Sequence, residues 1–86
     1  MQVPKWYNKG SKTERLDFLL NVAACHASSS CNLQGLAEKL ELTPFVFGYW
    51  KRQGTVPVNR AKEIERLVGR DVVRWECLVS PETNFE

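Results

Sequence analysis

Residues 43–57 read TPFVFGYWKRQGTVP. Thr43 is a favourable helix N-cap and is followed by a proline, which is well tolerated in the first turn. Phe47 and Trp50 are three residues apart, which places both on one side of a short helix. The internal glycine and the many aromatic residues favour helix only weakly. The start signal and the spacing together predict a helix over residues 44–52, with the glycine that follows the basic pair ending the segment.

Apolar residues recur with helical spacing in the part of the chain that precedes this stretch. They predict a first helix that is capped by Ser11 or Thr13 and extends to about Ala27, and a second helix that is capped by Asn32. Only the tight turn 41–43 separates the second helix from the quoted stretch. The apolar stripes of these two helices consist of Leu16, Leu19, Leu20, Ala23, Ala24, Leu33, Leu36, Ala37 and Leu40.

Two more helices are predicted after the loop 53–57. The fourth begins at Val58 or Asn59, of which Asn59 is the better cap, and stops at Gly69. Its apolar stripe is Ala61, Ile64, Leu67 and Val68. Asp71 is expected to cap a short last helix, which Pro81 ends. The expected fold is therefore all-α, with a flexible basic arm (1–11), a five-helix domain (12–81) and a tail (82–86).

Basic residues are concentrated in two segments of the chain. The 12 Lys and Arg residues and 10 Asp and Glu residues give a net charge of only +2. The first twelve residues, however, contain three lysines and no acidic residue, and residues 43–62 contain four basic residues and no acidic one. Basic segments separated in this way favour a polyanionic partner such as nucleic acid.

Other classes of protein fit the composition poorly. No apolar run approaches the roughly 18 residues of a membrane span, and no apolar signal segment follows the basic N-terminus, so the cytoplasm is the expected compartment. Three cysteines, an odd number, argue against a disulfide framework, and Cys25 is expected in the core. Cys25, His26 and Cys31 do not provide the four ligands of a structural zinc site. No metal, cofactor or enzymatic activity is expected, because no catalytic set is present.

The second and third helices are spaced so that they can cross over one core as a helix-turn-helix. Phe47 and Trp50 then face inward, and the outer face of the third helix consists of Pro44, Phe45, Gly48, Tyr49 and Arg52. The predicted DNA-contacting residues on and around that helix are Asn32, Thr43, Phe45, Tyr49, Lys51, Arg52 and Arg60. Phe45 suits a thymine methyl, Tyr49 a phosphate or base acceptor, and the basic side chains phosphates or guanine. Asn32 and Thr43 can position phosphates at helix N-termini.

A set of residues within 32–81 carries a family resemblance: Leu36–Ala37, Leu40, Leu42–Thr43, Phe47, Trp50, Gly54, Val56–Pro57, Arg60–Ala61, Ile64–Glu65, Leu67, Gly69 and Pro81. In this pattern the chain resembles the Cro-like and YdaS-like helix-turn-helix regulators of phages and prophages. The resemblance implies a lambda-repressor-like arrangement and sequence-specific binding of double-stranded operator DNA through the helix at about 44–52. It also implies a homodimer, at least on DNA, and a repressor-type role in a bacterial cell or phage-infected host.

Some positions depart from the family pattern. Glu41 stands where a turn glycine is usual, Leu33 stands where a phosphate-contacting glutamine is common, and the outer face of the third helix is unusually apolar. Phe45 and Tyr49 therefore have three possible roles: reading bases, packing on the arm or the last helix, or anchoring a protein partner, as in an antitoxin-like or antirepressor-like module. A purely structural helical domain is a further alternative. Trp6 and Tyr7 are candidates for a DNA arm, a dimer contact or packing on their own domain.

Overall fold

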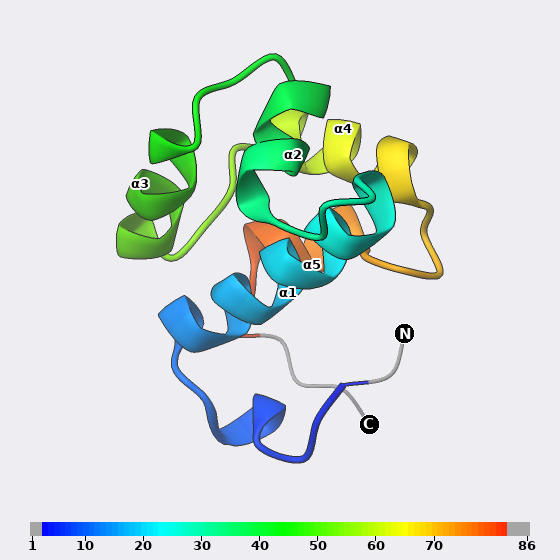
Figure 1. The fold of residues 1–86 in the computed structure, drawn as a ribbon. Coiled ribbons are helices and arrows are strands. Elements are labelled where there is room, and N and C mark those ends of the chain that lie inside the picture. The colour runs from blue at the N-terminus through cyan, green and yellow to red at the C-terminus, as the bar shows by residue number, and fades with distance from the viewer. Residues whose placement is uncertain (1–2, 83–86) are drawn as a thin grey trace.

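A computed structural model describes residues 3–82 of the 86-residue chain. These residues form a short 3-10 helix and five α-helices (Figure 1): η1 (Tyr7–Lys9), α1 (Lys12–Ala27), α2 (Leu33–Lys39), α3 (Phe45–Gln53), α4 (Val58–Val68) and α5 (Trp75–Val79). There is no strand in this part of the chain, so the predicted all-α, five-helix fold is confirmed. The radius of gyration is 11.6 Å. Residues 83–86 of the predicted tail lie outside the described residues.

Helix α1 is the scaffold of the domain. Helices α2, α3 and α4 all pack on α1, while α5 packs on α4 (Figure 1). Both α2 and α3 pack more closely on α1 than on each other, so α1 largely determines their mutual arrangement. All five helices contribute to a single core, whose main members are Leu16, Leu19, Leu20, Ala23, Leu36, Ala37, Leu40, Phe47, Trp50, Val56, Ala61, Ile64, Val73 and Leu78.

Two of the predicted helix caps are confirmed. Ser11, and not Thr13, caps α1: the Glu14 amide donates to Ser11 Oγ at 3.1 Å, and the Ser11 amide donates to Glu14 Oε1 at 3.0 Å. This capping box satisfies two free amides at the helix start and holds the pKa of Glu14 below its usual value, chiefly through the Ser11 backbone hydrogen bond. At the start of α2, Asn32 Oδ1 accepts a hydrogen bond from the Gly35 amide at 2.8 Å.

The other predicted N-caps are wrong, whereas Gly54 and Gly69 end α3 and α4 as predicted. Pro44, which already has helical dihedral angles, directly precedes α3, and no side-chain hydrogen bond caps this helix, so Thr43 does not cap it. Helix α4 begins at Val58, which leaves Asn59 inside the first turn. Helix α5 begins after Asp71, at Trp75, whose amide donates to Glu65 Oε2 of α4 at 2.9 Å. The acceptor for the first amide of α5 is therefore a side chain on another helix, ten residues earlier in the chain.

The described part of the predicted arm is packed against the domain. Tyr7 is completely buried in the core, and burial raises the pKa of its hydroxyl to about 12. Trp6 remains 43% exposed, with its ring edge-on to Phe18 at 5.8 Å. Of the roles considered for Tyr7, the structure supports packing on its own domain.

A buried arginine ties this segment to the rest of the domain. Arg15 of α1 is only 6% exposed, and its guanidinium lies 5.2 Å from the centre of the Tyr7 ring. It donates to the carbonyls of Gly10 at 3.0 Å, Asn8 at 2.5 Å and Pro81 at 3.1 Å. A buried cation normally requires such partners. The carbonyls that surround Arg15 therefore hold together the beginning, the first helix and the end of the described chain.

Cys25 and Cys31 form a disulfide, contrary to the sequence-based expectation. Cys25 lies at the exposed end of α1, where it is not part of the core, and Cys31 directly precedes the cap of α2. Cys77 is the free, buried cysteine. An odd number of cysteines leaves one residue unpaired but does not prevent the other two from pairing. Cys25 and Cys31 lie only six positions apart, across the link between α1 and α2, where they can meet.

Reducing this disulfide should lower the free energy of unfolding by about 2 kcal/mol, because the closed loop restricts the unfolded chain. Urea unfolding with and without dithiothreitol measures the difference. A Cys25→Ser/Cys31→Ser double variant that retains Cys77 is the control and should not respond to the reductant. Equal stability of the wild type under both conditions would show that the bond does not contribute.

Candidate nucleic-acid interface

Helix α3 has a buried side and an exposed side, as its spacing predicts. Phe47 and Trp50 are 1% and 3% exposed, and their rings pack edge to face at 5.4 Å. Phe45 and Tyr49 on the other side are 89% and 54% exposed. The helix ends at Gly54, whose φ of 75° is left-handed, and the Gly54 amide donates to the Trp50 carbonyl at 2.8 Å. A large apolar side chain and a phenol are therefore presented to solvent on a helix that is fixed from behind.

The turn between α2 and α3 directs the exposed helix away from α2. Glu41 has a φ of 59°, in the left-handed region that favours glycine. Such a conformation costs a non-glycine residue roughly 1 kcal/mol. It is accompanied by a hydrogen bond from the Leu42 amide to the Ala37 carbonyl at 2.8 Å, which closes the C-terminus of α2. Figure 1 shows α3 at the edge of the molecule after this turn.

The two basic side chains near the end of α3 differ in their surroundings. Lys51 Nζ forms an ion pair with Asp17 Oδ1 of α1 at 3.0 Å, and the Lys51 carbonyl accepts a hydrogen bond from the Thr13 hydroxyl at 3.0 Å. Lys51 thus helps to attach α3 to α1, a role different from the predicted DNA contact. Arg52 is exposed and forms no salt bridge with any residue in 3–82.

The fold brings the two basic segments of the sequence together. The aliphatic part of the Lys12 side chain passes over Gly54: its Cδ lies 3.2 Å from the position that a Cβ atom at Gly54 would occupy. Lys12, in the first turn of α1, is exposed and is thus a neighbour of the end of α3. The sequence-based site omitted Lys12. The only signal for it was the acid-free N-terminal segment, which did not indicate where the segment would pack.

The remaining predicted contact residues are more dispersed. Thr43 is exposed just before α3. Asn32 Oδ1 is engaged by the Gly35 amide and by the Ser30 hydroxyl, at 2.8 and 3.1 Å. Arg60 of α4 pairs with Glu63 at 3.1 Å, with both side chains about 40% exposed. Exposed pairs of this kind are worth at most about 1 kcal/mol, so Arg60 can exchange this partner for a phosphate.

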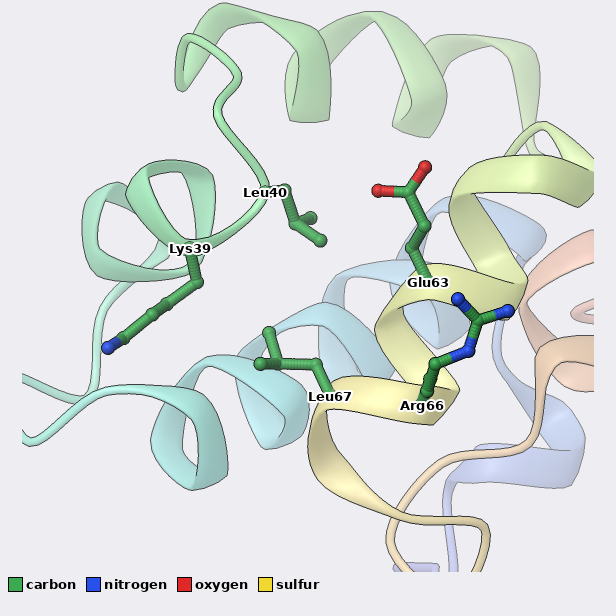
Figure 2. A pocket seen from close by; sticks show the side chains of 5 residues that line it. All are labelled: Lys39, Leu40, Glu63, Arg66 and Leu67. Atoms are coloured by element: carbon green, nitrogen blue, oxygen red, sulfur yellow. The ribbon is translucent and has the colours of Figure 1, made fainter.

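A cavity of about 350 Å³ lies between α2 and α4 and is drawn in Figure 2. Leu40 at the end of α2 and Leu67 on α4 line it from opposite sides, and Lys39, Glu63 and Arg66 complete the lining. Leu67 is 40% exposed, so its predicted place in the buried stripe of the fourth helix is wrong. The lining combines two basic side chains, two leucines and a carboxylate that is already paired with Arg60.

Comparison of the chain with protein-family models, with curated proteins and with solved structures gave no match. Within residues 3–82, no group of three or more His, Cys, Asp or Glu residues is arranged to hold a metal ion. None of the helices in that same range is long and apolar enough to cross a membrane.

Proposed function

We propose that this protein is a sequence-specific DNA-binding regulator of the Cro or repressor type that binds a double-stranded operator through α3. In this proposal it acts by binding, without catalysis or a cofactor, and it binds as a homodimer, as the regulators that residues 32–81 resemble are expected to do. An operator for such a dimer is an inverted repeat.

The observation that carries the proposal is the exposed outer face of α3 within a sequence segment that has basic residues and no acidic one. The carboxylate that α1 places against this helix, Asp17, is paired with Lys51. No acidic residue occurs from Thr43 to Lys62. Arg52 and Lys12 flank the end of the helix, and neither forms a salt bridge within the described residues. The major groove is wide enough to admit a helix, and phosphates attract the basic residues at its margin. A helix held from behind by Phe47 and Trp50 presents its other side without rearrangement.

Binding to duplex DNA should weaken steeply as salt is raised from about 50 to 200 mM, because basic side chains release counterions from phosphates. Arg52→Ala should weaken binding about tenfold at low salt and reduce the slope of log K against log[salt] by about 1 per subunit. Fluorescence anisotropy with labelled duplexes measures both quantities.

Arg74→Ala is the matched control. It removes the same charge from an exposed position just before α5, in the segment that Figure 1 draws on the opposite side of the domain from α3. Its salt slope should equal that of the wild type. The proposal would be contradicted if the affinity of the wild type for duplex DNA did not change with salt concentration. A salt slope of Arg52→Ala equal to that of the wild type would contradict it as well.

A protein-binding module is the second candidate, because Phe45 is 89% exposed on a fixed helix. Such a side chain, together with Tyr49, can anchor a protein interface. The DNA proposal requires Tyr49→Ala to weaken a selected operator more than random DNA. If both DNAs lose affinity equally, Tyr49 does not read sequence, and the protein-binding candidate gains support.

A further inference from the structure

At four of the five glycines of this chain, an added side chain would meet a close neighbour or a left-handed backbone. A Cβ atom at Gly35 would overlap the Ser28 side chain, and one at Gly10 would lie 2.9 Å from the Trp6 ring. Gly54 and Gly69 have φ angles of 75° and 103°, which residues with a Cβ atom rarely adopt. At each of these positions, the structure itself explains the absence of a side chain.

Gly48 is the exception. It lies in the interior of α3, and a Cβ atom placed there would meet no atom within 4 Å other than those of its chain neighbours and the surrounding helix backbone. A glycine inside a helix is less favourable than alanine by roughly 1 kcal/mol. No contact within the domain explains why this destabilising glycine is present. This indicates that the glycine serves a contact with another molecule.

The position of Gly48 indicates what that contact is. Phe45, Gly48, Tyr49 and Arg52 occupy positions i, i+3, i+4 and i+7, which lie together on one face of a helix. Residues three and four apart are direct neighbours, so Phe45 and Arg52 are the residues next to Gly48 on that exposed face. The two aromatic side chains are 89% and 54% exposed. Because Gly48 has no side chain, the helix backbone is uncovered on this face beside exposed aromatic side chains, and a small apolar group can approach the helix closely there. We call this position the Gly48 notch.

Resting on the proposed function, we propose that Gly48 is the close-approach position of α3, at which the C5-methyl group of a thymine meets the helix backbone beside Phe45 in the major groove. A phosphate suits the notch less well, because backbone amides inside a helix are already bonded and offer it no donor. The thymine methyl is the apolar group that the major groove displays. Arg52 is exposed and forms no salt bridge within residues 3–82, so it is the side chain next to the notch that suits a neighbouring phosphate.

The test begins by selecting bound duplexes from a random pool with the wild-type protein and then replacing each thymine of the selected site with uracil, which removes only the methyl group. At one position, wild-type affinity should fall about fourfold. Gly48→Ala should bind the thymine site at least about tenfold more weakly, and at that position it should no longer prefer thymine to uracil. Its melting temperature should nevertheless rise by about 3–6 °C.

Asn21→Ala is the control, since it adds helix propensity at an exposed position on α1 and should leave binding unchanged. Three results would overturn the assignment of Gly48 alone. Gly48→Ala binds like the wild type, or it melts at a lower temperature than the wild type, or the affinity of the wild type changes at none of the thymine-to-uracil replacements. Absence of salt-dependent duplex binding by the wild type would instead overturn the proposed function, and the Gly48 assignment with it.

Discussion

Replacing Arg15 with methionine should lower the free energy of unfolding by about 3–5 kcal/mol. Methionine can fill much of the buried space, but it offers no donor to the carbonyls of Gly10, Asn8 and Pro81. The hydrogen bond to Pro81 is buried and the other two are part-buried, and losing the donor to a buried carbonyl is more costly than losing an exposed hydrogen bond. Since small domains have only about 5–15 kcal/mol of stability in total, much of the variant should be unfolded at moderate urea concentrations.

Urea unfolding followed by circular dichroism measures this effect. Arg15→Lys separates charge from geometry: a lysine keeps the cation but lacks the planar set of donors that reaches three carbonyls, so it should recover only part of the loss. Arg74→Met makes the same chemical change at an exposed position and should alter stability by less than about 0.5 kcal/mol. A full recovery by Arg15→Lys, or equal losses for Arg15→Met and Arg74→Met, would contradict the assigned role of Arg15.

Trp50→Ala should cost about 3–5 kcal/mol, because it leaves a cavity behind α3 and removes the edge-to-face contact with Phe47. The adjacent Tyr49→Ala is a closely matched control. It removes a similar aromatic side chain from the same helix, but from a position that is 54% exposed instead of 3%. Its effect on stability should be within about 0.5 kcal/mol.

The two variants together test the orientation of α3. Comparable losses of stability, or a larger loss for Tyr49→Ala, would mean that the helix is rotated from the described orientation. With the expected pattern, Tyr49→Ala becomes a suitable variant for binding experiments, because any loss of affinity can then be assigned to the surface and not to unfolding.

The sequence predicted the helices and the two sides of α3 because both depend on local periodicity. An apolar residue every three or four positions marks a helix, and Phe47 and Trp50 follow that pattern within a single turn. Asn32, and Ser11 as one of two candidates beside Thr13, could be named as caps because their partners, Gly35 and Glu14, lie three residues away. Asp71 failed as a cap because the partner of the α5 amide, Glu65, is ten residues distant and on another helix.

Within the candidate interface, the sequence indicated the exposed pair Phe45 and Tyr49 but not the different surroundings of Lys51 and Arg52. Lys51 pairs with Asp17, 34 residues earlier in the chain, and no local pattern reveals such a contact. The placement of Lys12 beside Gly54 is hidden in the same way.

By itself, the sequence determined the number and approximate positions of the five α-helices, the inward side of α3 and the two separate basic segments. Only the tertiary structure decided that these segments meet, that Tyr7 is buried, that Arg15 links residues as far apart as 66 positions, and that Gly48 has no structural need to be a glycine. The physical reason is that periodicity and capping depend on neighbours within a few residues. Charge pairing, burial and the space around a backbone depend on which distant segments pack together.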